Sequence, residues 1–320
     1  MSRSRRSKIP APRPPPSNFG YNQRDAIQSK DCPAANTFGM KTSYPILDPH
    51  APETHRTRGR CALGVMIKAP RAGASKTRLV PPLTHEEAAR LSVAFLRDTA
   101  ANMADACAED SDGEVHAVAV YTPAGAEDEF DKLLPPTFAL LAQRGDTFGA
   151  RLFNAASDLL RLGYESCCLI DSDSPTLPRA LLTAALAELR RPGDRLVLGP
   201  ADDGGYYLIG MKRARARLFE EIAWSTADVL AQTVERAREI KLDVGLLPAW
   251  YDVDDAQTLR RLCVELFDAP NSDDDADDAC DARLAPYPAP HTRAELARLL
   301  EGEARARLLA EAAAREGHVA

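Results

Sequence analysis

Short apolar runs alternate with longer amphipathic stretches along most of the chain. Apolar runs bounded by turn residues are typical of buried strands, and they occur at 62–67, 115–121, 138–143, 166–170, 195–198, 206–211 and 244–247. Apolar positions three or four residues apart predict helices at 84–107, 147–162, 178–190, 226–240, 256–267 and 292–315. Because strands alternate with helices, we expect βαβ crossovers and an α/β fold with a mostly parallel sheet flanked by helices.

Local signals mark where several of these helices begin and end. Thr84 is a typical helix N-cap, and Glu87 follows it by three residues, which is the spacing of a capping box. Gly163 is the residue type that most often ends a helix, and Pro178 suits a first helical turn. These signals support the helices independently of the hydrophobic pattern.

Both ends of the chain lack this alternation. Residues 1–61 contain nine of the 24 prolines, so we expect a disordered Pro-rich leader, and it has no apolar segment of the kind found in secretory signals. Residues 268–281 hold seven aspartates, which predicts a flexible acidic linker over 268–291 and leaves a C-terminal helix within 292–320. The expected folded domain is therefore 62–267.

The net charge of −7 is unevenly distributed. The leader carries 11 Lys and Arg against 4 Asp and Glu, so the rest of the chain has a net charge of −14. An acidic body argues against a broad nucleic-acid-binding surface and is compatible with an enzyme that binds anionic substrates through a divalent metal. No apolar run reaches 18 residues, so the sequence predicts no membrane span.

The seven cysteines include no CxxC pair, which argues against a structural zinc site. Cys167 and Cys168 lie within an apolar run. We interpret them as buried, reduced thiols, as expected for a cytoplasmic protein.

A basic loop follows the first predicted strand. Backbone N–H groups and cationic side chains in such a loop can surround phosphates, although a solvated basic loop would have the same composition. The loop is not a Walker A motif, because Pro70 and Ser75 stand where that motif needs glycine. The candidate phosphate-binding residues are Lys68, Arg71, Gly73, Lys76, Thr77 and Arg78.

Carboxylates follow two other predicted strands. Asp171 and Asp173 come directly after 166–170, and Asp252 and Asp254 follow 244–247. Ligands of open α/β sheets bind beyond the carboxyl ends of strands, and Mg²⁺ is often held by one or two carboxylates together with substrate phosphates. These four aspartates are therefore candidate ligands of Mg²⁺ or Mn²⁺, although Asp and Ser before Pro also form ordinary turns.

A glycine pair stands just before the strand predicted at 206–211. Gly204 and Gly205 permit a positive φ or a close approach of the backbone to a ligand, and Asp203 precedes them. A hairpin turn would explain the same residues, and both interpretations can hold together. The sequence contains no GxSxG motif and no histidine pair at catalytic spacing, so it does not support hydrolysis by a serine or cysteine nucleophile.

Five segments together resemble a known bacterial family. They are, in chain order, KAPRAGASKTRL, DSDSPTLP, GPADDGGYYLIG, WSTADVL and DVDD, and the resemblance covers about residues 62–267. They resemble the glycosyltransferase-like proteins of the radical-SAM/selenodomain-associated type, which belong to the nucleotide-diphospho-sugar transferase superfamily. The resemblance implies the GT-A fold, a Rossmann-like mixed, mostly parallel sheet.

The resemblance also implies roles for individual residues. It implies a nucleotide pocket at the basic loop, a metal at Asp173, and Asp203 as the acid of the DGG turn. Asp252 and Asp254 match the DVD segment, whose second acid is a further metal ligand. The sequence departs from the family at Asp171, where the family usually has glycine, so the place of this carboxylate is open.

Two reactions are compatible with these residues. In the first, a sugar is transferred from a nucleotide-diphospho-sugar to a small acceptor: the metal neutralises the leaving diphosphate, Lys76 adds positive charge, and Asp203 acts as base if transfer inverts. The second is nucleotidyl transfer of the guanylyl or cytidylyl type, in which a small acceptor attacks an NTP and pyrophosphate leaves. The activity usually assigned to the family that the sequence resembles favours sugar transfer. A nucleotide-binding module without catalysis is the third possibility, and the oligomeric state is not predicted.

Overall fold

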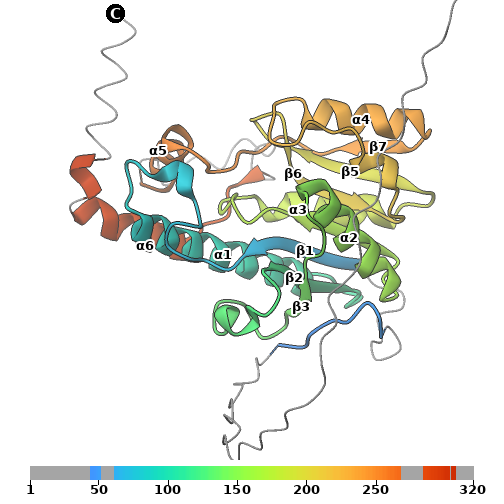
Figure 1. The fold of residues 1–320 in the computed structure, drawn as a ribbon, viewed down its shortest axis with the longest axis horizontal. Coiled ribbons are helices and arrows are strands. Elements are labelled where there is room, and N and C mark those ends of the chain that lie inside the picture. Colours follow the sequence, from blue (N-terminus) through green and yellow to red (C-terminus); the bar gives the residue numbers. More distant parts are fainter. Residues whose placement is uncertain (1–43, 52–60, 268–283, 303, 308–320) are drawn as a thin grey trace, which may run out of the picture. The chain divides into compact units, whose positions relative to one another are not determined.

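The computed structural model describes residues 44–51, 61–267, 284–302 and 304–307, all within one compact unit, Met40–Ala320. Seven strands form one sheet: β1 Cys61–Lys68, β2 Val115–Thr122, β3 Ala139–Ala142, β4 Ser166–Ile170, β5 Arg195–Pro200, β6 Tyr206–Met211 and β7 Asp243–Leu246. Their order in the sheet is β3-β2-β1-β4-β6-β5-β7 (Figure 1). The predicted α/β fold with a mixed, mostly parallel sheet is confirmed.

One strand runs against the others. β6 pairs antiparallel with both β4 and β5, whereas all other pairs in the sheet are parallel. The turn at 201–205, which leads into β6, therefore lies at the edge where the parallel strands end. This reversal brings the glycine pair to the same edge as the loops that follow β1 and β4.

Helices cover both faces of the sheet. The described helices are α1 His85–Ala108, α2 Phe148–Arg161, α3 Arg179–Arg190, α4 Val229–Glu239, α5 Ala256–Phe267 and α6 Pro290–Glu301. α1 and α3 pack on one face, and α2 and α4 pack on the other. Successive residues of a strand point to opposite faces: Cys167 packs with α2, and Cys168 packs with α3. Both thiols are free and fully buried, as predicted.

The predicted capping box of α1 is present. The Thr84 hydroxyl accepts a hydrogen bond from the backbone N–H of Glu87 at 3.2 Å, and the Glu87 carboxylate accepts one from the N–H of Thr84 at 2.8 Å. None of the helices in the described ranges is both long enough and apolar enough to cross a membrane.

Part of the predicted disordered leader is ordered. Residues 44–51 lie against β3, where Leu47 donates a backbone hydrogen bond to Leu140 and Leu140 donates one to Pro45, each at 2.8 Å. Tyr44 and Leu47 are buried, because these two side chains fill gaps beside β3. Residues 44–51, which lie within the predicted leader of 1–61, therefore pack against the sheet, and β1 begins at Cys61 rather than at 62. Residues 1–43 and 52–60 lie outside the described residues.

The C-terminal helix begins two residues earlier than predicted. Fully buried Asp98 of α1 accepts hydrogen bonds from the N–H of His291 at 3.0 Å and of Thr292 at 2.6 Å, which satisfies the first turn of α6. α1 and α6 lie side by side, as Figure 1 shows. Most of the predicted acidic linker, 268–283, and residues 303 and 308–320 lie outside the described part of the chain.

Candidate active site

Four loops meet at the edge of the sheet where the parallel strands end. They are the basic loop after β1, the turn after β4 that contains Asp171 and Asp173, the turn at 201–205 before β6, and the segment 250–255. The backbone joins two of them directly, because Val253 donates a hydrogen bond to the carbonyl of Asp173 at 2.9 Å. The motifs that the sequence analysis singled out are therefore neighbours in space.

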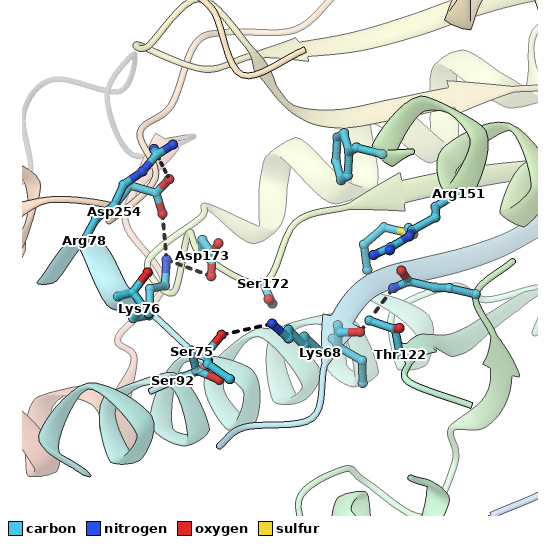
Figure 2. A pocket seen from close by; sticks show the side chains of 16 residues that line it. Lys68, Ser75, Lys76, Arg78, Ser92, Thr122, Arg151, Ser172, Asp173 and Asp254 are labelled. Carbon is cyan, nitrogen blue, oxygen red and sulfur yellow. Dashed lines mark hydrogen bonds and ion pairs between the residues drawn. The ribbon is translucent and has the colours of Figure 1, made fainter. Parts of the chain in front are cut away.

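Lys76 lies at the centre of this arrangement. Its side chain is 6% exposed, and its ammonium is 2.8 Å from Asp173 Oδ1, 3.0 Å from Asp254 Oδ1 and 2.7 Å from the carbonyl oxygen of Val253 (Figure 2). Burial alone would lower the pKa of Lys76, but the two carboxylates outweigh it and the pKa is raised, so Lys76 stays protonated. All three ammonium protons meet protein oxygens, so in this arrangement the predicted phosphate contact of Lys76 is not available.

The two aspartates that flank Lys76 are half exposed. The side chains of Asp173 and Asp254 are 38% and 39% exposed, and Arg78 lies 3.3 Å from Asp254 Oδ2. Each carboxylate can therefore still reach a bound molecule. Asp173 and Asp254 are the two predicted metal ligands that contact the Lys76 ammonium.

The other two predicted ligands behave differently. Asp171 accepts hydrogen bonds from the N–H of Asp173 at 3.0 Å and from the Ser174 hydroxyl at 3.2 Å, so its carboxylate closes its own turn. Burial, and then repulsion from Asp173, raises the pKa of Asp171 to about 8. Burial, and then repulsion from Asp254, raises the pKa of Asp252 to about 6. In both cases burial is the larger cause of the raised pKa, and a neighbouring carboxylate adds to it.

The glycine pair forms a tight turn, as predicted. The Asp203 carboxylate accepts a hydrogen bond from the N–H of Gly205 at 2.8 Å. Gly204 has a φ of 89°, and a Cβ at this position would collide with the backbone of Ala227. Gly204 is thus required both by its backbone conformation and by close packing, and the turn holds Asp203 at the mouth of the site.

Two cavities of similar size adjoin at this edge. The first, of about 340 Å³, has Lys68, Lys76, Arg78 and Arg151 in its wall, and Figure 2 shows Arg151 across from Lys76. The second has a volume of about 350 Å³. The acids that line the second cavity are Asp171, Asp173, Asp203, Asp252 and Asp254. The first cavity is thus rich in cations and the second is rich in carboxylates. The two cavities share Arg78, Phe148, Asp173 and Asp254, so these two aspartates lie at the junction between them.

Two predicted residues of the basic loop do not line either cavity. Arg71 forms an exposed ion pair with Glu129, and one of its hydrogen bonds, from Nε, measures 3.0 Å. Gly73 has a φ of 74° and faces open space. Lys68 and Thr77 do line the first cavity, and Lys68 donates a hydrogen bond to the carbonyl of Ala74 at 3.1 Å.

The sequence analysis missed two residues of the site, Phe148 and Arg151. Phe148 is 53% exposed, lines both cavities and meets the Trp224 ring edge to face, with centroids 5.3 Å apart. Gly149 packs against the same indole, and a Cβ there would lie 2.5 Å from Trp224 Nε1. The signal that could have found them is position: both stand in the first turns of the helix that follows β3, at the edge where ligands bind.

The residues at the junction fit a hard divalent cation. Asp173 and Asp254 offer oxygen ligands, and the Lys76 ammonium lies between them as a stand-in positive charge. No group of three or more His, Cys, Asp or Glu within the described ranges is placed to hold a metal ion, although all four predicted ligands line the second cavity. A cation held by these two carboxylates would need oxygens from a substrate or water, as is usual for Mg²⁺.

Comparisons with known proteins identify the family. Residues 102–226 match the profile of a family described as "Uncharacterized protein conserved in bacteria (DUF2064)". A solved structure from Desulfovibrio desulfuricans G20, described as a "putative nucleotide-diphospho-sugar transferase", is 30% identical with a TM-score of 0.60, and the match covers 78% of this chain and 96% of that one. No curated protein matches the chain.

The weaker structural matches include a synthase and a synthetase. A 4-diphosphocytidyl-2C-methyl-D-erythritol synthase from Anaerococcus prevotii DSM 20548 is 10% identical, with a TM-score of 0.40 and coverage of 63% of this chain and 94% of that one. A CMP-2-keto-3-deoxy-manno-octonic acid synthetase in complex with CTP is 9% identical, with a TM-score of 0.39 and coverage of 64% and 97%. TM-scores this low support no statement about activity. On the 30% identical match, which covers 78% of the chain, the chain belongs to the family of this nucleotide-diphospho-sugar transferase-like protein and shares its Rossmann-like α/β fold, and residues 102–226 carry the DUF2064 match.

Proposed function

We propose that this protein is a metal-dependent glycosyltransferase that uses a nucleotide-diphospho-sugar donor. The observation that carries the proposal is the junction of a cation-rich cavity with a carboxylate-rich one at Asp173 and Asp254. A nucleotide-diphospho-sugar has the same polarity, because an anionic diphosphate joins a neutral sugar that is rich in hydroxyl groups. The 30% identical relative, described as a putative enzyme of this class, supports the same conclusion.

The cation-rich cavity suits the nucleotide diphosphate. Lys68, Arg78 and Arg151 face it from the loop after β1 and from α2. Arginine forms paired hydrogen bonds with phosphate oxygens, and Lys68 supplies a compact positive charge. As the bond between the sugar and the diphosphate breaks, negative charge grows on the leaving oxygen, and these cations stabilise it.

The carboxylate-rich cavity suits the sugar and the acceptor. Carboxylates accept hydrogen bonds from hydroxyl groups, and the ring of Trp224 offers an apolar face at the same place. In an inverting transfer, the acceptor hydroxyl oxygen bonds to the anomeric carbon, the bond from that carbon to the diphosphate oxygen breaks, and the hydroxyl proton passes to Asp203. Gly205 holds one oxygen of this carboxylate, which fixes its direction.

Asp173 and Asp254 are the residues proposed to hold Mg²⁺ or Mn²⁺. When bound there together with the donor, the cation would neutralise charge on the leaving diphosphate. The protein contributes the spacing of the two acids, which the hydrogen bond from Val253 to the Asp173 carbonyl maintains.

Nucleotidyl transfer is the second candidate. Lys68, Arg78 and Arg151 around one cavity of about 340 Å³ would also suit the triphosphate of an NTP. In that reaction an acceptor oxygen bonds to the α-phosphorus, and the bond to the β-phosphate oxygen breaks to release pyrophosphate. A nucleotide-binding module without catalysis would bind a nucleotide and release neither product.

The test measures which product leaves. The full chain is incubated with UDP-, GDP- and CDP-sugars and with NTPs, each with Mg²⁺, Mn²⁺ or EDTA, and released nucleoside diphosphate and pyrophosphate are quantified. We expect metal-dependent release of nucleoside diphosphate from one sugar nucleotide. Pyrophosphate release from an NTP alone would replace the proposal with the second candidate, and binding without turnover would favour the third.

Adjacent carboxylates supply a matched pair of variants. We expect Asp203→Asn to lower kcat by about 10²-fold to 10⁴-fold, the usual contribution of a general base. Asp202→Asn removes the neighbouring charge, but Asp202 pairs with Arg261 at 2.6 Å and lines neither cavity, so turnover should be retained. Equal losses in both variants would remove Asp203 from the proposed mechanism.

A further inference from the structure

We propose that Lys76 is a positioning residue that competes with divalent cations for Asp173 and Asp254, so that the metal binds weakly until the donor arrives. The inference rests on the proposed function in one respect, namely that these two acids are the metal ligands. It assigns to Lys76 a role different from the phosphate contact expected from the sequence.

The geometry gives Lys76 one set of partners. Its three contacts, to Asp173 Oδ1 at 2.8 Å, Asp254 Oδ1 at 3.0 Å and the Val253 carbonyl at 2.7 Å, match the three donors of an ammonium group. The backbone of Lys76 has a φ of 50°, and its ammonium lies 5.5 Å from the centroid of the Phe95 ring. The side chain is 6% exposed. Lys76 is thus directed inward by its surroundings.

The two carboxylates would remain together without Lys76. The hydrogen bond from Val253 to the Asp173 carbonyl, at 2.9 Å, ties their segments through the backbone alone. Asp254 is also held by its own N–H, which donates to the Thr258 hydroxyl at 3.1 Å. Removing the lysine charge would therefore leave two facing carboxylates in place, and not a collapsed site.

Competition follows from the charges. With Lys76 between them and Arg78 3.3 Å from Asp254 Oδ2, Asp173 and Asp254 belong to a group with a net charge of 0, and without Lys76 the net charge of the group is −1. A divalent cation is attracted more strongly to the second arrangement, and the attraction is large because the site is only partly open to water. A donor diphosphate supplies further negative oxygens and so offsets the effect of the lysine, which links metal binding to donor binding.

The test is a titration with Mn²⁺ alone, without nucleotide. Free Mn²⁺ is followed by electron paramagnetic resonance in the wild-type chain and in the variants Lys76→Met, Lys76→Gln and Lys68→Met. We expect Lys76→Met and Lys76→Gln to bind Mn²⁺ at least tenfold more tightly than the wild type. Lys68→Met removes the same charge from the wall of the same cavity, but Lys68 contacts a backbone carbonyl and no carboxylate of the pair. The Mn²⁺ affinity of this variant should therefore differ from that of the wild type by less than about threefold.

A merely structural lysine would give the opposite pattern. If Lys76 only supported the fold, its removal would lower thermal stability and leave Mn²⁺ affinity unchanged or weaker, and that result would overturn the proposal. An equal gain in Lys68→Met would also overturn it, because the effect would then be one of general charge. Combining Lys76→Met with Asp173→Asn and Asp254→Asn should abolish the gain.

A second measurement uses the wild-type chain and does not depend on any variant folding. Anomalous diffraction from crystals soaked in MnCl₂, at a concentration well above the wild-type dissociation constant found in the titration, should place Mn²⁺ between Asp173 and Asp254 with the Lys76 ammonium moved away. The proposal would be overturned if no Mn²⁺ were found at Asp173 and Asp254 and Lys76 still lay between them, whether or not Mn²⁺ were bound elsewhere. Neither measurement requires turnover, so a failure to detect glycosyl transfer would leave both results standing and would count against the proposed function alone.

Discussion

The packing of Gly149 against Trp224 leads to a prediction about the wall shared by the two cavities. A Cβ at position 149 would lie 2.5 Å from Trp224 Nε1 and 2.7 Å from Cε2, distances that real Cβ atoms do not adopt. In Gly149→Ala the indole must therefore move. Its edge-to-face contact with Phe148, at 5.3 Å between centroids and 78° between planes, would be lost.

The two energetic effects of this change oppose each other. Loss of the aromatic pair costs about 0.5–1.5 kcal/mol. Alanine in place of glycine within a helix stabilises it by about 0.5–1 kcal/mol, and position 149 belongs to α2. The free energy of unfolding should therefore stay within about 1 kcal/mol of the wild type. The cavity wall changes nonetheless, so donor affinity should fall by about tenfold, or about 1.4 kcal/mol.

Tryptophan fluorescence and donor binding separate these effects. The chain has two tryptophans, so Trp250→Phe leaves Trp224 as the single reporter. In that background Gly149→Ala should shift the emission to longer wavelength and weaken donor binding, with an almost unchanged urea midpoint. Gly302→Ala makes the same chemical change in α6's C-cap, where a Cβ meets its nearest atom at an ordinary 3.4 Å, and should alter neither signal. Unchanged emission and affinity in Gly149→Ala would refute the reasoning.

Three further predictions concern the framework. Gly204→Ala should cost at least about 2 kcal/mol in urea unfolding, because its φ is 89° and its Cβ would meet the Ala227 backbone; a loss below 0.5 kcal/mol would contradict this. Asp98→Ala should cost about 2 kcal/mol and loosen α6 in hydrogen exchange, since two N–H groups lose their acceptor; unchanged protection of α6 would argue against the cap. Burial alone would raise the pKa of Asp110, but hydrogen bonds from Glu114 and Arg190 hold it below its ordinary value, so Asp110→Asn should cost about 1–3 kcal/mol at pH 7. That difference should shrink as the pH falls below about 4, the pKa of an unfolded Asp, and a constant difference from pH 7 to pH 3 would refute it.

The sequence pattern predicts the elements well and their arrangement less well. Strand and helix positions follow from local periodicity, and Thr84 and Glu87 place the start of α1 correctly because a capping box is a local interaction. The reversed direction of β6 is different, because hydropathy does not record whether a strand runs parallel to its neighbours. The early start of α6 also has a distant cause, the buried carboxylate of Asp98.

The same distinction applies to the site. Asp173 and Asp254 each follow a strand in the sequence, and this position alone predicts that they lie close together, because strand ends share one edge of the sheet. The partners of Lys76 are not readable from spacing, since it contacts Val253, which is 177 residues away in the sequence. In the sequence, Phe148 is one apolar residue of an amphipathic helix, and only its exposure and its place in the walls of both cavities make it part of the candidate site.

The two cavities draw on different stretches of the chain. Residues found only in the wall of the cation-rich cavity lie between Met66 and Ser172, whereas most of those found only in the wall of the carboxylate-rich cavity lie between Ala201 and Asp252. Insertions or exchanges in the loops around 201–205 and 224–229 can therefore remodel one cavity and spare the other. Under the proposed function, such a division would let acceptor preference change while nucleotide recognition stays the same, and it offers a place to join segments in chimeric enzymes.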